Sequence, residues 1–223
     1  MKKKTLLSWS CGKDSAWALH VLRQDPNIDV AGLVCTVNQE FDRVAIHGIR
    51  KELLELQAQN LDLPLYQVRI PYPCSNEAYE NAMKAFINEA AGLGVEYIAF
   101  GDLFLQNVRE YREKLLAGTG IKPLFPIWGI STQSLSSQMV SSGLRAIITC
   151  VDSKYLQQEF SGREYNQSFL DDLPKKVDLC GENGEFHSFA IAGPMFKKSI
   201  DVEVGETIYR QGVYFTDIHK KYS

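Results

Sequence analysis

The run from Ser10 to Ser15 combines residue types that bind phosphate. It reads Ser-Cys-Gly-Lys-Asp-Ser and follows the apolar residues Leu6 and Leu7. A strand that delivers such a loop to the start of a helix offers free backbone N–H groups, two hydroxyls, an ammonium group and the positive end of the helix dipole. We therefore expect an anion to bind there.

The spacing of this loop excludes a Walker loop, in which Ser or Thr follows the Gly-Lys pair directly. Here Asp14 separates Lys13 from Ser15. The order Ser-x-Gly-Lys-Asp-Ser instead resembles the PP-loop of the ATP pyrophosphatases, which split ATP into AMP and pyrophosphate. The resemblance implies nucleotide contacts from Ser10, Cys11, Gly12, Lys13, Asp14 and Ser15. The commonest pattern has Gly at position 11, so we expect Cys11 to avoid a positive φ.

A second cluster of polar residues spans residues 178–187 and reads Asp-Leu-Cys-Gly-Glu-Asn-Gly-Glu-Phe-His. Its glycines allow tight turns that present Glu182 and Glu185 toward one point. These carboxylates could ligate a second Mg²⁺, hold ammonia or orient a substrate, and His187 could accept a proton from an attacking amine. The structural alternative is a solvated turn before an edge strand.

Apolar and amphipathic segments alternate along the first half of the chain. The pattern predicts strands over residues 5–9, 29–36, 65–70 and 97–100, and helices over residues 15–23, 49–61 and 76–93. Asp14 or Ser15 is placed to cap the first helix. Such alternation indicates a parallel sheet covered by helices, with ligands at the carboxyl ends of its strands.

Gly101 and Asp102 follow the fourth predicted strand and should therefore open onto the nucleotide. Arg109, on the helical stretch that comes next, could reach a phosphate bidentately or could be a surface cation. For Lys13 and Asp14 we expect catalytic roles, because pyrophosphate gains charge as it departs. Asp14 could hold Mg²⁺ directly or through water.

The pattern changes in the last third of the chain. A helix near residues 133–142 and a strand over residues 146–151 precede a short helix near residues 166–173, a strand over residues 186–191 and antiparallel edge strands within residues 200–218. We expect an ATP-binding domain over residues 1–150 and a substrate-binding domain over residues 151–223. The fold class is α/β, with a Rossmann-like parallel sheet between helices and a smaller C-terminal α+β lobe.

Composition is typical of a soluble enzyme, with 223 residues, 45% apolar content and a net charge of -3. This charge gives no broad basic surface for nucleic acid. The chain has no apolar run long enough for a membrane span and no signal-peptide pattern, so we expect a cytoplasmic protein. Five scattered cysteines without a C-x-x-C pair favour reduced thiols.

Four motifs together resemble the diphthine-ammonia ligase family over almost the whole chain. They are Ser8 to Ser15, Phe100-Gly101-Asp102 followed by Arg109 and Glu110, Phe125-Pro126-Ile127-Trp128, and Cys180 to His187. The last is the most specific, since other PP-loop enzymes do not, as a rule, carry it. The resemblance implies an N-terminal adenine nucleotide α-hydrolase-like domain and a C-terminal substrate domain.

The family reaction is an ATP-dependent amidation. The resemblance implies that ATP, with Mg²⁺, adenylates the carboxylate of diphthine on elongation factor 2, and that ammonia then displaces AMP to give diphthamide. Short members occur in bacteria, which lack diphthamide, so the acceptor is either diphthine or a small carboxylate metabolite. A homodimer is an assembly that the sequence leaves open.

Two other functions fit parts of the sequence. A nucleotide-binding sensor would hold ATP or AMP without turnover and would not need the two glutamates of the acidic block. A PP-loop enzyme that modifies RNA, of the thiolase or lysidine type, should show a basic face, and the thiolase should also carry a partner cysteine for Cys11.

Overall fold

The computed structural model describes residues 1–41, 43–44 and 48–221 of the chain. Its first half is a parallel five-stranded sheet in the order β3-β2-β1-β4-β5. The strands are β1 (Lys3–Ser8), β2 (Ile28–Asn38), β3 (Leu65–Ile70), β4 (Tyr97–Ala99) and β5 (Lys122–Leu124). The strand order reverses between β1 and β4, so their carboxyl ends border a crevice that can receive a ligand. The predicted α/β class is confirmed.

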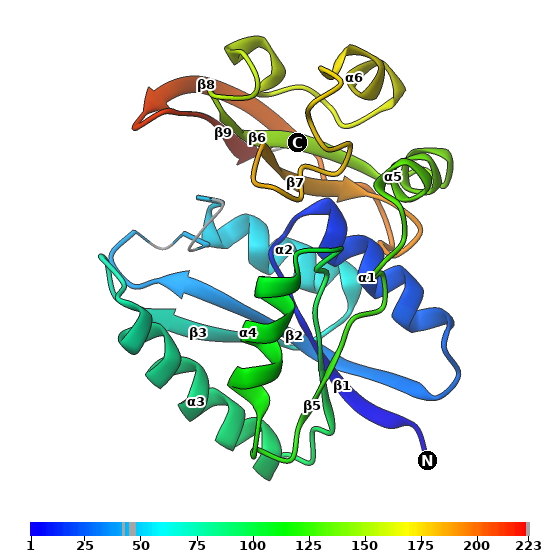
Figure 1. Cartoon of the computed structure of the whole chain (residues 1–223), viewed down its shortest axis with the longest axis vertical. Helices are drawn as coiled ribbons and strands as arrows, with labels where there is room; N and C mark the ends of the chain where they lie inside the picture. The colour runs from blue at the N-terminus through cyan, green and yellow to red at the C-terminus, as the bar shows by residue number, and fades with distance from the viewer. Residues whose placement is uncertain (42, 45–47, 222–223) are drawn as a thin grey trace.

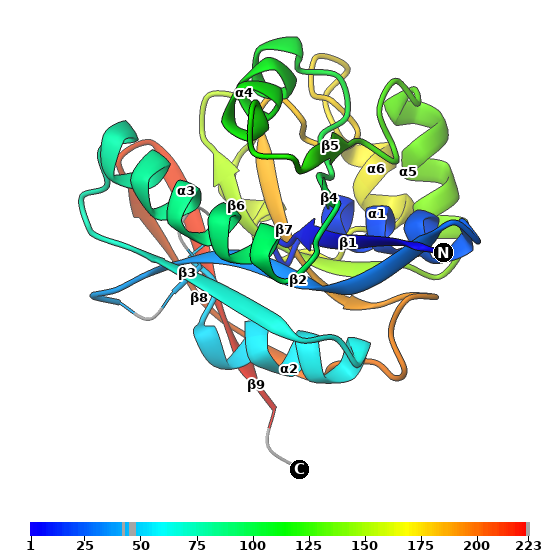
Figure 2. The same cartoon turned by 90° about the horizontal axis from the view of Figure 1, so that it is seen from below.

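Helices cover both faces of this sheet (Figures 1 and 2). On the face toward the rest of the chain lie α1 (Lys13–Gln24) and α2 (Lys51–Leu61), and on the other lie α3 (Asn76–Gly92) and α4 (Gln106–Leu116). Each helix buries an apolar side; α1, for example, buries Trp17 and Leu19. The first helix begins two residues earlier than the sequence pattern predicts.

A second, antiparallel sheet of four strands forms the upper lobe in Figure 1, in the order β7-β6-β9-β8. Its strands are β6 (Arg145–Asp152), β7 (Phe186–Ala192), β8 (Val202–Arg210) and β9 (Val213–Lys220), and α5 (Thr132–Ser141), the 3-10 helix η1 (Gln158–Phe160) and α6 (Gln167–Asp172) accompany it. The antiparallel strands that the sequence predicts near the C-terminus are present.

The expected domain boundary at residue 150 falls inside β6, which pairs on both sides with strands of the second sheet. The predicted strand over residues 146–151 therefore exists but belongs to the second lobe. The sequence of β6 is a nearly continuous apolar run, because the strand is buried over most of its length. Such a run is typical of a strand in a parallel sheet, which explains why it was assigned to the first domain. We propose that the first domain ends after β5 and that the second begins before α5.

The two lobes share one hydrophobic core. It runs from Leu7 and Trp17 of the first lobe to Ile148 and Phe189 of the second. Because α1 packs directly on β7, the loop that precedes α1 lies at the boundary of the lobes. In the described part of the chain, no helix is both long and apolar enough to cross a membrane.

Candidate active site

The loop between β1 and α1 has an unusual backbone at Cys11, where φ is 66°. The expectation that Cys11 avoids a positive φ was therefore wrong. A non-glycine residue in this region costs about 1–3 kcal/mol, and the surrounding contacts must hold it there. The Cys11 carbonyl accepts hydrogen bonds from Ala190 N at 2.8 Å and from Gln57 Nε2 at 3.1 Å.

Gln57 supports this loop from α2, although sequence reasoning did not select it. Its side chain is fully buried, accepts a hydrogen bond from Trp9 Nε1 at 2.8 Å and donates to the Ala190 carbonyl at 2.7 Å as well as to Cys11. A buried amide with three satisfied partners fixes the backbone around it. The sequence signal was a polar residue within the buried side of a helix.

The predicted phosphate-binding groups gather at the start of α1. The hydroxyls of Ser10 and Ser15 lie 3.1 Å apart, and Ser10 Oγ also accepts a hydrogen bond from Gly12 N at 3.3 Å. Gly12, not Asp14 or Ser15, is the N-cap of the helix, and no side chain caps it. The capping prediction was wrong because the helix starts earlier, and the first-turn N–H group of Lys13 donates instead to Ser188 Oγ of β7.

Lys13 points into a buried site between the lobes. Its Nζ donates to Asp14 Oδ1 and Oδ2 at 3.0 and 2.8 Å and to the carbonyl of Cys180. The rings of Tyr165 and Phe186 lie 5.5 and 5.3 Å from the ammonium. Burial by itself lowers the pKa of Lys13, but the adjacent Asp14 carboxylate outweighs this effect and the pKa is raised. Lys13 therefore carries its charge at neutral pH.

Glu185 is buried and its carboxylate holds the acidic turn together. It accepts hydrogen bonds from Asp178 N at 3.0 Å, from Asn183 N at 3.0 Å and from Asn183 Nδ2 at 3.0 Å. Gly181 has φ 69°, and a Cβ there would lie 2.8 Å from the Phe186 carbonyl oxygen. The turn is therefore a packed structure rather than a loose solvated one.

Glu182 reaches from this turn to the first lobe. Its Oε1 accepts hydrogen bonds from Leu103 N at 2.7 Å and from Phe104 N at 3.4 Å. Burial raises the pKa of Glu182 to about 7, an effect that the bond from Leu103 opposes and the nearby charge of Asp14 reinforces. A carboxyl group with such a pKa can exchange a proton near neutral pH.

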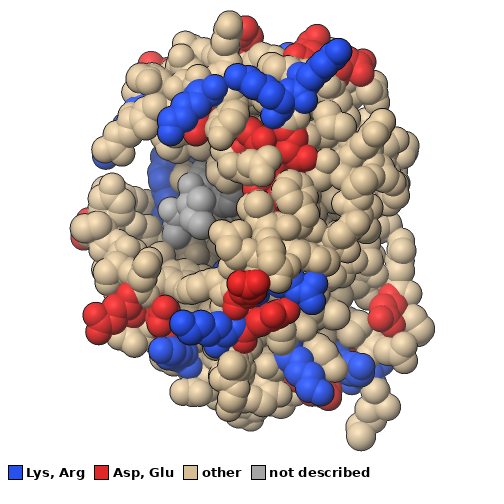
Figure 3. Space-filling view, in the orientation of Figure 1, with Lys and Arg blue, Asp and Glu red and all other residues tan. Residues whose placement is uncertain are grey.

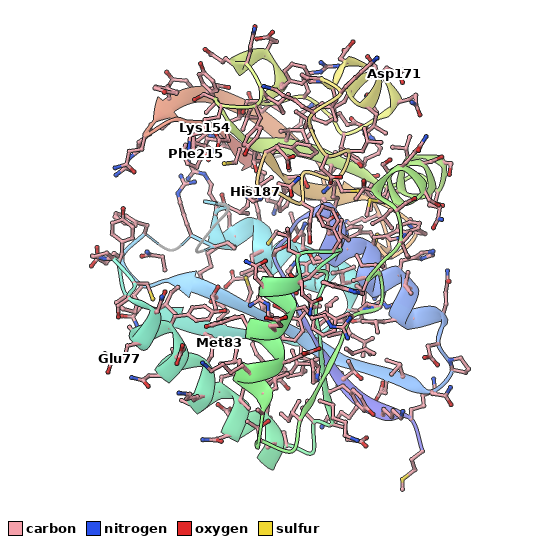
Figure 4. All side chains as sticks on the ribbon, viewed as in Figure 1. Glu77, Met83, Lys154, Asp171, His187 and Phe215 are labelled. Carbon is pink, nitrogen blue, oxygen red and sulfur yellow. The ribbon has the colours of Figure 1, made fainter. Side chains whose placement is uncertain are left out.

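His187 lies on β7 at the boundary between the lobes (Figure 4). Burial, with the positive charge of Lys13, lowers the pKa of His187 to about 4. The imidazole is therefore neutral at pH 7.

Gly101 packs against the phosphate-binding loop. A Cβ at this position would lie 3.0 Å from Ser15 N and 3.1 Å from Asp14 C, so any larger residue would have to displace the backbone at the start of α1. Asp102 follows it and faces Arg112 of α4, with 3.5 Å between Oδ2 and Nε.

Arg109 of α4 lies outside this group of residues. Its guanidinium stacks on the rings of Phe125 and Trp128, each 4.9 Å from Cζ, and its Nε donates to a carboxylate oxygen of Glu113.

Two adjoining cavities open at this crevice. The larger, of about 780 Å³, lies at the carboxyl ends of β1 to β4 and is lined mainly by apolar and aromatic side chains such as Ile70, Tyr79 and Phe100. The smaller, of about 220 Å³, brings together the predicted site residues. It is lined by Ser10, Gly12, Lys13, Asp14, Ser15, Gly101, Asp102, Glu182 and His187, together with Arg112 and Ser188.

These shapes suit a nucleoside in the larger cavity and a chain of phosphates in the smaller. Of the residues predicted from the sequence, Cys11, Arg109 and Glu185 do not line the smaller cavity. Arg112 and Ser188 line it but were not selected. Only the fold brings Ser188 to the phosphate-binding loop, where its Oγ accepts a hydrogen bond from Lys13 N at 3.2 Å.

A third cavity, of about 650 Å³, is lined by Gly48, Ile49 and Tyr72 of the first lobe and by residues of β8 and β9. Figure 3 shows this face of the molecule hollowed between the two lobes. Beside this cavity, Arg43 and Arg50 both contact Asp217, at 3.3 and 2.5 Å. The site residues predicted from the sequence do not line it.

The family described as Diphthamide synthase N-terminal domain matches residues 2–123, more than half of the chain, and the family described as Diphthamide synthase C-terminal domain matches residues 131–223. Among curated relatives, a diphthine-ammonia ligase of Danio rerio is 25% identical over 199 residues, covering 81% of this chain and 77% of the relative. A diphthine-ammonia ligase of Homo sapiens is 26% identical over 230 residues, covering 94% of this chain and 86% of the relative.

Proposed function

Because the chain belongs to the diphthamide synthase family, we propose that it is an ATP-dependent ligase that joins ammonia to a carboxylate. The proposed acceptor is diphthine carried by a protein, as the names of the relatives indicate. A carboxylate is a poor acceptor for ammonia until its oxygen is turned into a leaving group. Transfer of AMP from ATP supplies such a group.

One observation carries this proposal. The phosphate-binding loop of the first lobe and the acidic turn of the second form two walls of a single small cavity. Gly12 and Lys13 come from one lobe, and Glu182 and His187 from the other. A nucleotide held by the first wall therefore meets the polar groups of the second, which is what a reaction between ATP and two further substrates needs.

The proposed reaction has two steps. An oxygen of the acceptor carboxylate attacks the α-phosphorus, and the bond to the bridging oxygen breaks so that pyrophosphate leaves with the electron pair. The nitrogen of ammonia then attacks the acyl carbon, the bond to AMP breaks, and the nitrogen loses a proton. Backbone N–H groups at the start of α1 and the hydroxyls of Ser10 and Ser15 would hold the pyrophosphate.

We propose that His187 accepts the proton that the nitrogen of ammonia loses in the second step. This imidazole is neutral and lines the same cavity as Glu182, whose pKa of about 7 lets it exchange protons near neutral pH. General base catalysis of this kind contributes about 10²- to 10⁴-fold in rate. Lys13 and Glu185 would act by holding the two walls of the cavity in place.

Mg²⁺ is part of the proposal. The described residues contain no group of three or more His, Cys, Asp or Glu side chains arranged to hold a metal ion. Mg²⁺ that arrives on nucleotide phosphates needs only one or two carboxylates, and Asp14 lines the phosphate-sized cavity. These residues therefore fit an Mg²⁺ ion brought by ATP, with Asp14 as its protein contact. The bound ion would neutralise charge on the phosphates.

The cysteines give little support to RNA thiolation. Burial raises the pKa of Cys180 to about 12, so its thiol stays protonated at neutral pH and is a poor sulfur carrier. Burial also raises the pKa of Cys11 well above its usual value. The cytoplasmic location and a homodimer stay predictions; light scattering of the purified protein tests the second.

The proposed function is tested with purified protein, ATP, Mg²⁺, ¹⁵N-ammonium and diphthine-bearing elongation factor 2 from cells that lack the ligase. We expect AMP and pyrophosphate as products, and ¹⁵N in the modified side chain. Formation of ADP would contradict the α-phosphate chemistry. Tight ATP binding without any turnover, with this acceptor and with extract from the host cell, would favour the sensor alternative.

A further inference from the structure

Arg112 of α4 stands where the two cavities of the active site meet. Only four side-chain positions line both the nucleoside-sized and the phosphate-sized cavity among the residues that the structure describes. They are Ser8, Ser10, Phe100 and Arg112. Arg112 is the charged member of this set.

The guanidinium group of Arg112 is positioned by Phe100 and Asp102, but its hydrogen-bonding capacity is not fully used. Its Cζ lies 5.0 Å from the centre of the Phe100 ring, and its Nε lies 3.5 Å from Asp102 Oδ2. Both Nε and Oδ2 are buried, and apart from this ion pair neither has a hydrogen-bond partner within the described chain. Buried polar atoms without partners are rare in folded proteins and often mark a site that is completed by a ligand.

The guanidinium group of Arg112 lies where the α-phosphate of a bound ATP is expected. If the adenosine part of ATP occupies the larger cavity and the two outer phosphates occupy the smaller, the α-phosphate lies at the junction. This phosphate is the reacting centre, and negative charge accumulates on its oxygens as the carboxylate attacks. A guanidinium at that point can donate two parallel hydrogen bonds to phosphate oxygens.

We propose that Arg112 is a catalytic residue that binds the α-phosphate of ATP and stabilises its transition state, and that Asp102 is a positioning residue for Arg112. This assignment rests on the proposed function. Ion pairing to Asp102 on one edge and stacking on Phe100 fix the plane of the guanidinium and leave its remaining N–H groups for the phosphate.

Arg109, one helical turn away, provides a matched comparison. It has the same charge and lies on the same helix, but it stacks on Phe125 and Trp128 and donates to Glu113 at 2.8 Å. It lines neither cavity. Loss of Arg109 therefore removes a surface cation without removing a contact to the proposed nucleotide.

The first test is a comparison of AMP and adenosine binding by calorimetry. The two ligands differ only in the α-phosphate, so the ratio of their affinities isolates contacts to that group. In Arg112→Ala we expect AMP affinity to fall by about tenfold or more while adenosine affinity stays unchanged. Arg109→Ala should keep both affinities. Asp102→Asn should lower AMP affinity more than adenosine affinity, which a merely structural defect would not do.

The second test is the rate of AMP formation in the complete reaction. Arg112→Ala should lower kcat by about 10²- to 10³-fold, and added guanidinium should restore part of the loss. Arg112→Lys keeps a charge and should retain more activity than Arg112→Ala, which guards against a folding defect.

The outcomes separate the two proposals. Equal AMP-to-adenosine ratios in wild type and Arg112→Ala, or an unchanged kcat, would overturn the role of Arg112 while the ligase reaction stands. Release of ADP by the wild-type protein would instead overturn the proposed function, and the assignment of Arg112 to the transition state would be overturned with it.

Discussion

The carboxylate of Glu182 in the second lobe accepts a hydrogen bond from the backbone N–H of Leu103 in the first lobe at 2.7 Å. This contact joins the acidic turn to the loop that follows β4 and carries Asp102. The same loop touches the start of α1 through Gly101. The phosphate-binding loop, the loop after β4 and the acidic turn therefore form one connected unit.

Glu182 should make the protein less stable as the pH rises. Burial raises the pKa of Glu182 from 4.5 to about 7, so between these values the folded protein holds a proton that the unfolded chain has released. Where the unfolded chain binds fewer protons than the folded protein, raising the pH favours unfolding. The free energy of unfolding should therefore decrease as the pH rises from 4.5 to about 7. Glu182→Gln keeps an oxygen acceptor for Leu103 and should flatten this slope, as measured by urea unfolding. Glu203→Gln, on the exposed part of β8, serves as the control, and an unchanged slope in Glu182→Gln would contradict the assignment.

Removing the charge of Lys13 should affect both stability and turnover. Lys13→Met leaves the Asp14 carboxylate and the Cys180 carbonyl without their buried donor, so we expect the free energy of unfolding to fall by about 2 kcal/mol. AMP formation should be lost by orders of magnitude. Lys84→Met, which removes an exposed ion pair with Glu80, should change stability by less than about 0.5 kcal/mol. Thermal unfolding and an AMP assay measure both effects, and wild-type values in Lys13→Met would disprove this role.

Gly101→Ala should weaken nucleotide binding. The added methyl group would lie 3.0 Å from Ser15 N and must push the start of α1 away from the cavity. We expect a clear loss of ATP affinity, measured by calorimetry. Gly92→Ala, where a methyl group meets nothing within 4 Å, is the matched control and should keep wild-type affinity. Equal affinities in the two variants would show that the close approach of Gly101 does not matter for binding.

Glu185→Gln should separate ATP binding from amide formation. The new amide NH₂ group would face N–H donors of Asp178 and Asn183, so at least one buried hydrogen bond is lost and the acidic turn shifts. Because Glu185 does not line the phosphate-sized cavity, ATP affinity should stay close to that of the wild type. Amide formation, followed by ¹⁵N incorporation, should be blocked, and full retention of it would show that the turn tolerates the change.

His187→Gln should slow amide formation by about 10²-fold while pyrophosphate release continues. The pH profile gives a second readout. Since the pKa of His187 is lowered to about 4 and that of Glu182 is raised to about 7, an inflection of the wild-type rate near neutral pH should come from Glu182 and should persist in His187→Gln. An inflection there that disappears in His187→Gln would contradict the buried, neutral imidazole. An unchanged amide rate in the variant would remove His187 from the proton transfer.

Local sequence patterns were sufficient to predict most of the elements. The strand over residues 65–70 was predicted with the bounds that β3 has, and the helix over residues 76–93 differs from α3 by one residue. Apolar periodicity and turn residues report on local conformation, and this information lies within a few neighbouring residues. The strand that became β6 was also found, but its sheet was not, since periodicity does not identify the pairing partner.

Side-chain direction was what the sequence could not predict in the site. Arg109 and Arg112 lie on one helix and carry the same charge, and the resemblance to the family selected Arg109 from the sequence. The stacking of Arg109 on Phe125 and Trp128 turns it away from the cavities, and the ion pair with Asp102 keeps Arg112 at their junction. Gln57, whose partners lie at positions 9, 11 and 190, could not be recognised from its neighbours.

The sequence by itself determined the chemical groups of this protein: a phosphate-binding loop after the first strand, an acidic block near residue 182, and the alternating elements of a parallel sheet. These features depend on residue type and short spacing, which can be read directly from the sequence. The tertiary structure alone decided that the loop and the block line one cavity, that Lys13 is buried, and that Cys11 adopts a positive φ. Those outcomes depend on contacts between residues far apart in the chain, where packing of the whole core selects one arrangement among many that local preferences allow.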